Sequence, residues 1–599
     1  MQLKHLGHRL ASGAAISAII INALAPIARA DQPNDHDHDR GTRTPIKHVI
    51  VIIGENRTFD HIFATYQPHG GESVRNLLFE GIVRADGSPG PNYQRAVQSS
   101  AQDAAPSPYL SSPQSKQAYT TLPAPLAGGP TNPPFTSVAL AQQVENGLAA
   151  DYYQFLTTGG TGLTAHTPDT RISYDAHPVT SLPPGPFQLT PGVPYDAYAA
   201  SPVHRFYQMW QQMDCNAEYM TPNNPAGCLS DLFPWVEVTI GAGSNGKPQA
   251  ANFNAASTGE GGTSMGFYNV QAGDAPYLKQ LADTYSMSDN YHQAVAGGTG
   301  ANHIMLGTGD AIWFSDGNGD PTQPPHNQLV AAGTANAGIV DEVENPNPAP
   351  GTNNWYTEDG YGGGSFGSPS YGGGSYSNCS DPHQPGVDAI TDYLGSLQRP
   401  VASRCDPGHY YLLNNYNPGY FGNGADAFTD TSAKNTVFTI PPSTVRNIGD
   451  ALLEKNISWR YYGDQWNRYV NDPYYADPTN AYCNICNFFQ YSTSIMTNAA
   501  VRTEHLKDTT DLYDDVAKGW LPAVAFVKPS GYVDGHPASS KLDLFEGFVK
   551  KIVDAVQAQP ALWQDTAIFI TVDEGGGYYD SGYVQPLDFF GDGTRIPLI

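Results

Sequence analysis

Two hydrophobic runs of the chain, one near each end, stop abruptly at polar side chains. Residues 46–53 are rich in β-branched side chains, and DTAIFITV at residues 565–572 repeats the pattern. Runs of this length and composition are typical of strands that are buried on both faces. We therefore expect two buried strands that end in oxygen donors. The polar residues at the ends of the two runs are Glu55, Asn56, Asp573 and Glu574.

Amphipathic segments accompany both predicted strands. Residues 57–66 (RTFDHIFATY) have helical spacing, and Ser540 stands where it can cap a helix that precedes the second strand. Strand, polar tip and helix is the α/β arrangement in which sites form at the carboxyl ends of strands. The predicted fold class is α/β, with a largely parallel central sheet flanked by helices and with long irregular insertions.

The chain divides into a leader, a linker and one long region. Residues 1–30 place basic side chains before a short apolar run and end in a small-x-small pattern, which predicts a secretory signal cleaved after Ala30. An N-terminal membrane anchor is the alternative. Residues 31–45 form a polar linker, and segments near 86–136 and 345–385 predict long surface insertions. The expected location is therefore periplasmic or secreted, without a stable membrane anchor.

The net charge of the chain argues against some classes of binding partner. The formal net charge is −27, from 30 Lys and Arg against 57 Asp and Glu. Nonspecific binding of nucleic acid needs clustered basic side chains, so this composition argues against it. An anionic substrate would need a local positive centre, which a bound metal cation supplies.

Six cysteines in an exported chain predict disulfides. The last two stand in a Cys-x-x-Cys arrangement, which is also the spacing of a redox motif or half of a zinc site. Proximity in the sequence favours three pairs among the many that six cysteines allow. The favoured pairs are Cys215 with Cys228, Cys379 with Cys405, and Cys483 with Cys486.

The four oxygen donors at the strand ends have a common interpretation. Carboxylate and amide oxygens are the ligands of a hard divalent cation, provided that the two strands are neighbours in the sheet. Taken separately, each pair is as easily a helix cap or a solvated turn. Their repetition after both strands favours a metal site.

A glycine-flanked turn offers a nucleophile. Thr299 lies among Gly297, Gly298 and Gly300, directly before the apolar segment HIMLGTG. The glycines permit close approach of the backbone to a ligand, and Asn302 would point at the same ligand if Thr299 opens a helix. Because metal coordination lowers the pKa of a hydroxyl, Thr299 is a candidate nucleophile.

Two histidines are candidates for proton transfer. His536 lies in the loop after the apolar strand of FVKPSGYVDGHPASS, and His204 lies in SPVHRFYQMWQQMD. A histidine beside a leaving oxygen can donate a proton to it. A turn histidine or a helix position without a catalytic role is the alternative for each.

Together these segments resemble a known family. The stretches HVIVIIGENRTFDHIF, GGTGANH, GHPASS and ALWQDTAIFITVDEGGGYYD, continuing to RIPLI, resemble the bacterial phosphoesterases. That family includes secreted acid phosphatases and the non-haemolytic type of phospholipase C, within the alkaline-phosphatase-like superfamily. The resemblance implies a phosphoesterase catalytic domain over residues 46–599. It also implies one divalent cation, of an identity that the sequence leaves open, with the ligands Glu55, Asn56, Thr299, Asp573 and Glu574.

The resemblance assigns further roles and shows two departures. Thr299 is expected to be the nucleophile, Asn302 to contact the phosphate, and His536 and His204 to lie at the active site with one more histidine. Family members commonly carry a histidine where this chain has Ser581. The chain also stops at RIPLI, where the family normally continues, so we expect a truncation at the C-terminus.

The implied function is a secreted metal-dependent hydrolase of phosphoric esters that acts through a phosphothreonine intermediate. An acid phosphatase acting on phosphomonoesters is the leading interpretation. A phospholipase C that cleaves phosphodiesters such as phosphatidylcholine is the alternative, and a noncatalytic secreted binding protein is a lesser one. The expected partner is a phosphate ester, either a small molecule or a phospholipid headgroup.

Overall fold

The computed structural model places most of the chain after residue 41. It describes residues 42–101, 109–113, 115–123, 133–158, 182–190, 192–240, 261–325, 328–330, 338–340, 342–346, 374–430 and 438–599. The expected signal peptide, most of the linker and much of the insertion near 345–385 lie outside these ranges.

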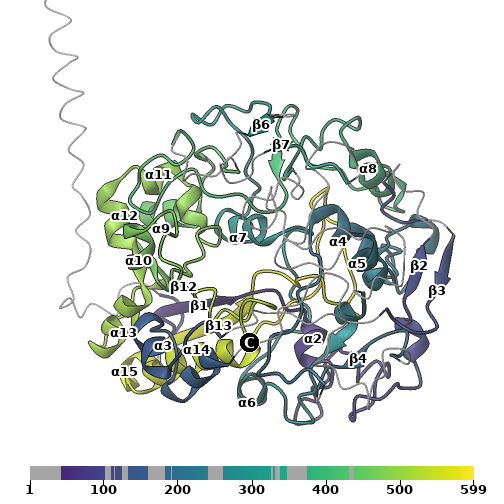
Figure 1. The fold of residues 1–599 in the computed structure, drawn as a ribbon, viewed down its shortest axis with the longest axis horizontal. Coiled ribbons are helices and arrows are strands. Elements are labelled where there is room, and N and C mark those ends of the chain that lie inside the picture. The colour runs from purple at the N-terminus through teal and green to yellow at the C-terminus, as the bar shows by residue number, and fades with distance from the viewer. Residues whose placement is uncertain are drawn as a thin grey trace, which may run out of the picture.

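A five-stranded parallel sheet forms the centre of the fold (Figure 1). Its strand order is β11-β10-β12-β1-β13. The first predicted strand, β1, pairs in parallel with β13 on one side and with β12 on the other. The strand bounds are β1 His48–Gly54, β10 Trp459–Gly463, β11 Leu506–Asp508, β12 Val524–Lys528 and β13 Thr566–Val572. The prediction of a largely parallel α/β sheet is therefore confirmed.

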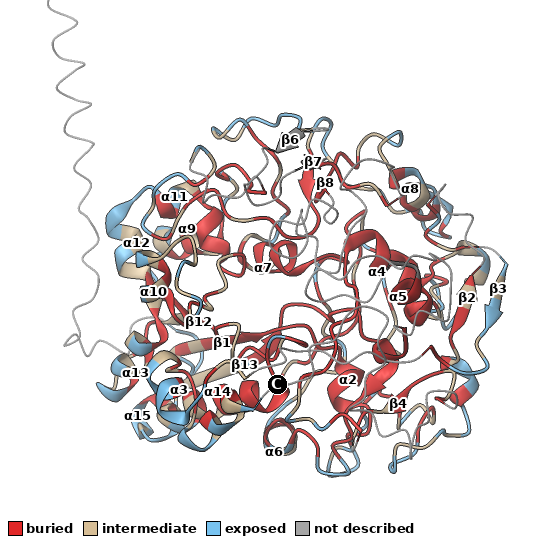
Figure 2. Ribbon diagram, in the orientation of Figure 1, coloured by how far each residue is buried: buried red, intermediate tan, exposed pale blue. Residues whose placement is uncertain are grey.

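Helices cover both faces of this sheet. Alternate residues of β1, Ile50 and Ile52, are fully buried in the core that they share with α13 (Thr509–Ala517) and α14 (Leu542–Gln557). A second core packs against the other face. It includes residues of β10 and of the segment around η7 (Phe488–Tyr491). Figure 2 shows the sheet interior as buried, whereas the outer surfaces of the flanking helices are exposed. Because both faces are covered, the strands read as nearly continuous apolar runs.

The helix α14 is amphipathic as predicted, but Ser540 does not cap it. The helix begins at Leu542, and its N-cap position, Lys541, makes no side-chain capping bond. The Ser540 hydroxyl instead donates to Tyr532 O and accepts from Gly535 N. The serine therefore closes the preceding loop, which contains His536, and the capping prediction is wrong.

The remaining helices and short strands pack against the sheet, against its flanking helices or around them. Within the described residues, four two-stranded sheets join short segments outside the central sheet. The helices are α2 Phe59–Phe63, α3 Val138–Val144, α4 Phe206–Met213, α5 Phe233–Ile240, α6 Pro276–Thr284, α7 Thr299–Thr308, α8 Val387–Ser396, α9 Ile448–Glu454, α10 Trp466–Asn471, α11 Thr493–Met496, α12 Ala499–His505 and α15 Pro560–Trp563. The short 3-10 helices are η1 Tyr93–Ala96, η2 Ala150–Thr157, η3 Ala217–Tyr219 and η5 Gly261–Met265. The short strands are β2 Ser99–Ala101, β3 Lys116–Ala118, β4 Phe187–Gln188, β5 Gly266–Phe267, β6 Gln328–Val330, β7 Gly338–Val340, β8 Tyr376–Ser377 and β9 Tyr411–Leu412.

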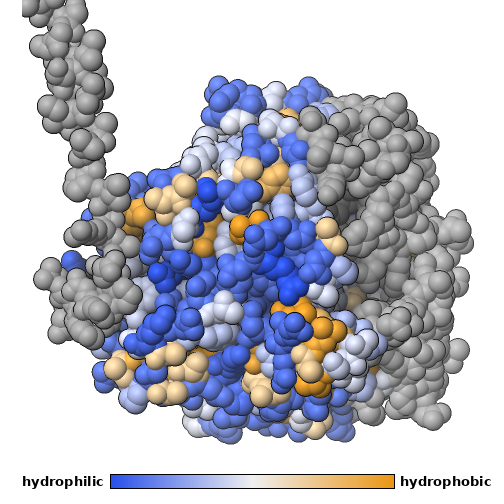
Figure 3. Space-filling model, turned by 60° about the vertical axis from the view of Figure 1, so that its left-hand side comes forward, coloured by the Kyte–Doolittle hydropathy of each residue, from blue (hydrophilic) through white to orange (hydrophobic). Residues whose placement is uncertain are grey.

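Disulfides and surface composition complete the picture. All six cysteines are paired as predicted, in the bonds Cys215–Cys228, Cys379–Cys405 and Cys483–Cys486. Hydrophilic residues dominate the face in Figure 3, where hydrophobic residues form small separate groups. Among the described residues, no helix is both long and apolar enough to cross a membrane.

Candidate active site

The two predicted pairs of oxygen donors meet at one edge of the sheet. Because β1 and β13 are parallel neighbours, Gly54 is paired with Val572, and the residues that follow these two strands lie side by side. The backbone N–H of Asn56 donates to Asp573 Oδ1 at 3.2 Å, and Glu574 N–H donates to the same oxygen at 2.8 Å. All four side chains are buried. The condition on which the metal prediction depended, adjacency of the two strands, is met.

Asn56 turns the chain sharply at the end of β1. Its φ of 57° is in the left-handed region, which asparagine tolerates better than most residues. One side-chain amide atom of Asn56 lies 3.2 Å from both Glu55 Oε2 and Asp573 Oδ1, and the other lies 2.8 Å from His536 Nε2. The turn thus places one amide between the two carboxylates and the histidine.

Thr299 opens α7, the condition on which the expectation for Asn302 depended, and faces the carboxylates. Its hydroxyl donates to Glu574 Oε1 at 3.0 Å and lies 3.5 Å from Glu55 Oε2. Gly297 allows this placement, because a Cβ there would lie 2.1 Å from the carbonyl oxygen of Leu413. Thr299 therefore contacts donors from both strand ends.

The glycine turn before α7 is hydrogen-bonded to the segment around Leu413. Gly298 N–H donates to Leu413 O at 3.3 Å, and Gly300 N–H donates to Asn415 Oδ1 at 2.6 Å. The side chain of Asn302 is engaged in the same turn: its amide donates to Gly297 O at 2.9 Å, and its oxygen accepts from Val295 N–H at 3.0 Å. In this structure Asn302 fixes the turn that carries Thr299.

Both predicted histidines lie beside the donors. His204 Nδ1 lies 2.7 Å from Pro202 O, which only accepts, so this nitrogen carries a hydrogen. His204 Nε2 is 3.4 Å from the Asn56 amide nitrogen and 3.9 Å from Glu574 Oε1. The rings of His204 and His536 are 6.3 Å apart between centroids. The two histidines therefore flank Asn56.

Two further residues at the site were missed in the sequence. His303 Nε2 is 3.2 Å from Glu55 Oε1 and 3.8 Å from Asp573 Oδ2. Lys528, the last residue of β12, is buried with its ammonium 3.0 Å from Glu55 Oε1. Signals for both were present: His303 stands one helical turn after Thr299, and Lys528 ends an apolar strand, as Glu55 does.

The buried cluster contains more acidic than basic side chains. Burial opposes ionisation of Glu55, but the Lys528 ammonium and the bond from His303 outweigh it and lower the pKa of Glu55. Burial and the neighbouring Glu55 raise the pKa of Asp573 well above its usual value. Burial lowers the pKa of Lys528, but Glu55 and Asp534 more than offset this and raise it. One ammonium thus faces several carboxylates, an excess of negative charge.

The residues fit a hard divalent cation. Donor atoms of Glu55, His303 and Asp573 all lie within 4.8 Å of one another. Asp573 Oδ2 is buried and has no hydrogen-bond partner among the described residues. A buried carboxylate oxygen without a partner is costly unless a cation binds it. The oxygen-rich set also matches the ligand preference of such ions.

The fold and site together define a class of protein. Four oxygen donors, a hydroxyl and histidines gather at the carboxyl ends of a parallel α/β sheet, as in α/β enzymes that act on anionic substrates. A sequence model of the phosphoesterase family matches residues 171–599, which is more than half of the chain. The chain belongs to the phosphoesterase family. The matched range contains Thr299, His536 and Asp573, whereas Glu55 and Asn56 precede it.

The chain is similar to curated proteins of two kinds, phospholipases C and acid phosphatases. A non-hemolytic phospholipase C of Burkholderia pseudomallei is 26% identical over 197 residues, which is 30% of this chain and 26% of the relative. A phosphate-repressible acid phosphatase of Penicillium chrysogenum is 28% identical over 196 residues, 31% of this chain and 45% of the relative. An acid phosphatase of Aspergillus niger is 30% identical over 141 residues, 23% of this chain and 33% of the relative. The chain therefore spans less than half the length of each of these relatives.

Proposed function

We propose that the protein is an exported metal-dependent phosphoric ester hydrolase, with Thr299 as nucleophile and phosphomonoesters as substrates. The observation that carries the proposal is the position of the Thr299 hydroxyl, 3.0 Å from Glu574 Oε1 and 3.5 Å from Glu55 Oε2 in a buried cluster. Membership of the phosphoesterase family and the acid phosphatases among the relatives support it.

The proposed chemistry assigns a step to each side chain. The Thr299 oxygen attacks phosphorus in line, and its proton passes to Glu574 Oε1, to which it is already hydrogen-bonded. The bond from phosphorus to the ester oxygen breaks, and His536 Nε2 donates a proton to that oxygen. Water then attacks phosphorus and gives a proton to His536, the bond from phosphorus to the Thr299 oxygen breaks, and that oxygen regains its proton from Glu574 as phosphate leaves. His204 lies on the other side of Asn56, where it can hydrogen-bond a phosphoryl oxygen.

The proposed metal site consists of Glu55, Asn56, Thr299, Asp573 and Glu574. A bound divalent cation would offset the charge on the phosphoryl oxygens and lower the pKa of the Thr299 hydroxyl. Asn302 is proposed as a phosphate contact. To make it, the amide would exchange its 3.2 Å bond to Gly298 O for the ligand and keep the 2.9 Å bond to Gly297 O.

Export is part of the same proposal. Three disulfides indicate an oxidising compartment, and residues 1–30 have the pattern of a signal peptide cleaved after Ala30. Mass spectrometry of the N-terminal peptide from secreted or periplasmic protein tests the cleavage position. A chain that retains residues 1–30 would contradict it.

Substrate class is tested with three substrates in parallel: a chromogenic phosphomonoester, a chromogenic phosphodiester and phosphatidylcholine. Wild type, Thr299→Ala and the matched variant Thr299→Ser are compared. We expect monoester turnover that falls on the order of 10³-fold or more in Thr299→Ala and is largely retained in Thr299→Ser. Monoester turnover that survives in Thr299→Ala would overturn the assignment of the nucleophile.

Phosphodiester cleavage is the second candidate function. The phospholipase C of Burkholderia pseudomallei among the relatives favours it. Thr299-dependent turnover of phosphatidylcholine without turnover of the monoester would establish this alternative. No Thr299-dependent turnover of any of the three substrates by the folded protein would contradict both.

A further inference from the structure

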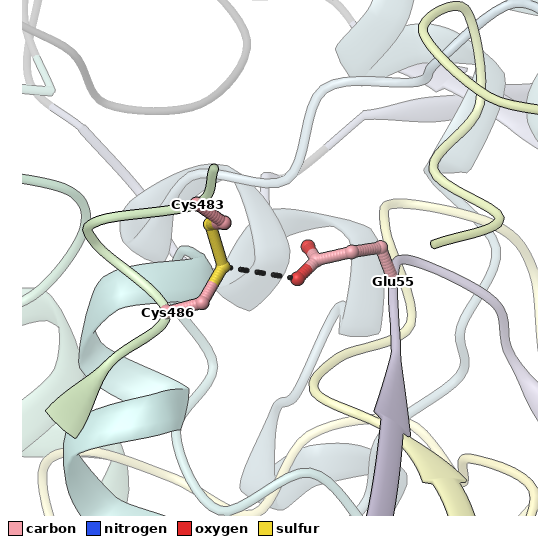
Figure 4. A group of neighbouring side chains, drawn as sticks. All are labelled: Glu55, Cys483 and Cys486. Carbon is pink, nitrogen blue, oxygen red and sulfur yellow. Dashed lines mark hydrogen bonds between the residues drawn. A yellow bond between two sulfur atoms is a disulfide. The ribbon is translucent and has the colours of Figure 1, made fainter. Parts of the chain in front are cut away.

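The disulfide Cys483–Cys486 lies against the candidate active site. Cys486 Sγ is 3.3 Å from Glu55 Oε1, and Figure 4 shows the carboxylate pointing at this sulfur. Cys486 is buried and Cys483 is partly exposed. Glu55 Oε1 therefore has three neighbours, since Lys528 and His303 contact the same oxygen.

The geometry points to a second set of metal ligands, in which the two sulfurs cannot bind a metal as long as they form the disulfide. We propose that reduction of Cys483–Cys486 creates a site for a soft divalent cation, such as Zn²⁺ or Cd²⁺, bound by both cysteine sulfurs and Glu55. One ligand atom from each of the three residues lies within 4.8 Å of the other two. Metal–sulfur bonds of about 2.3 Å and metal–oxygen bonds of about 2.0–2.2 Å span such separations with small movements. Thiolate ligands favour soft cations over the hard cations that carboxylates prefer.

A dithiol can supply the two electrons that reduce the disulfide Cys483–Cys486 to two thiols. A thiolate of the reductant attacks the partly exposed Cys483 sulfur, the bond between the two cysteine sulfurs breaks, and Cys486 leaves as a thiolate. The second reductant thiol then displaces Cys483, so that the reductant becomes a cyclic disulfide and the protein gains two thiols. Binding of the cation releases the two thiol protons.

The loop holds the two cysteines in place by bonds other than the disulfide. The Tyr461 hydroxyl donates to Cys486 O at 3.2 Å, and Tyr491 donates to Ile485 O at 3.1 Å. The Asn484 amide donates to Asn417 Oδ1 at 3.0 Å. These contacts remain after reduction, so the two sulfurs stay next to Glu55.

Sharing of Glu55 couples the new site to catalysis. Glu55 belongs to both donor sets, with Oε1 toward the cysteines and Oε2 toward Thr299. A soft cation on Oε1 draws negative charge from the carboxylate and weakens its hold on the catalytic cation. By linkage, the catalytic cation weakens binding of the soft one equally. This second effect rests on the proposed function, whereas binding of the soft cation does not.

Cadmium binding tests the site without an activity assay. The full chain is reduced with a dithiol without oxygen, the reductant is removed, and Cd²⁺ is titrated while the sulfur-to-metal charge-transfer absorption is recorded. The control is Cys483→Ser/Cys486→Ser, which keeps the other four cysteines. We expect reduced wild type to bind one more Cd²⁺ per chain than the reduced control, and oxidised wild type to show no such band. Equal binding by the two reduced proteins would overturn the proposal.

A variant that needs no reductant covers the case in which reduction unfolds the chain. Cys483→Asp leaves the other two disulfides intact and offers Asp, Cys486 and Glu55 as donors. We expect one Cd²⁺ per chain with a charge-transfer band, and no band in the matched variant Cys483→Asp/Cys486→Ser. Absence of the band in folded Cys483→Asp would also overturn the proposal. Failure of the proposed hydrolase function would instead be seen as phosphate ester turnover that is independent of Thr299.

Discussion

At the scale of single residues, Glu55 is the point on which the contacts of the site converge. One of its oxygens contacts Lys528, His303 and Cys486, and the other faces Thr299. The contacts to Oε1 therefore fix the orientation of the carboxylate, and Oε2 is directed at the Thr299 hydroxyl. Orientation of a ligand by its neighbours is a general means of tuning metal sites.

Replacing Lys528 tests this arrangement. Lys528→Met leaves Glu55 and Asp534 buried without their ammonium partner, which lies 3.0 Å and 3.4 Å from them. We expect the free energy of unfolding of the metal-free protein to fall by about 3–5 kcal/mol, measured in urea. Glu55→Gln/Lys528→Met is the control, and it should recover part of the loss because the uncompensated charge is removed. Equal losses in both variants would mean that the ion pair does not stabilise the fold.

The sequence predicts the donors of the site better than their surroundings. Glu55, Asn56, Asp573 and Glu574 follow from the polar ends of two apolar runs. His303 and Lys528 were not found, because each reaches Glu55 only through the packing of α7 and β12 around β1. The position of His303 one helical turn after Thr299, and of Lys528 at the end of an apolar strand, does not by itself show that either side chain reaches Glu55.

At the scale of elements, the turn before α7 determines where Thr299 points. Gly297→Ala would place a Cβ 2.1 Å from Leu413 O, a backbone atom that cannot move without shifting its loop. We expect a loss of stability of about 1–3 kcal/mol and a decrease in kcat of up to about 10²-fold.

The matched control is Gly395→Ala in α8, where an added Cβ meets nothing within 4 Å. It should leave kcat unchanged and stability unchanged or higher, because alanine favours a helix. Unfolding curves and phosphate release measure both effects. A Gly297→Ala variant that behaves like Gly395→Ala would contradict the close approach to Leu413.

A second element contact makes stability depend on pH. Glu546 on α14 accepts from the N–H groups of Tyr277 and Leu278 at the start of α6, and burial raises its pKa to about 8. In the unfolded chain the pKa of Glu546 has its ordinary value of 4.5. Between these values the folded state holds a proton that the unfolded state releases, so raising the pH favours unfolding.

Glu546→Gln removes this titration. We expect the free energy of unfolding of wild type to fall relative to Glu546→Gln by on the order of 3 kcal/mol between pH 5 and pH 8, with little difference between them below pH 4.5. Denaturant unfolding at several pH values measures the difference. A difference that is independent of pH would show that Glu546 titrates normally in the folded protein.

The element-level predictions succeeded where the signal was local. The strands β1 and β13 and the amphipathic helix α14 follow from apolar runs and helical spacing. The order of the strands does not, because pairing joins β1 to a strand more than 500 residues later in the chain. Ser540 was misassigned as a cap because its hydroxyl binds the loop before the helix, and a capping pattern cannot distinguish these two roles.

At the scale of the whole molecule, an acidic chain with a net charge of −27 places Glu55, Asp573 and Glu574 together in a buried cluster. We expect one divalent cation per chain, since a cation would balance the negative charge around Asp573. Removing it with a chelator should lower Tm and abolish turnover, and re-addition of the cation should restore both. Asp573→Asn should lack the cation from the start. A chelated protein with unchanged Tm and turnover would contradict the metal site.

The proposed function depends on Thr299 carrying the phosphoryl group during turnover. The most direct measurement is mass spectrometry of peptides from protein that is quenched in acid during turnover of a phosphomonoester, with Thr299→Val as the control. We expect a transient phosphorylated peptide whose modified residue is Thr299 and which is absent from the control. Release of phosphate by wild type without phosphorylation of Thr299 at any time during turnover would contradict it.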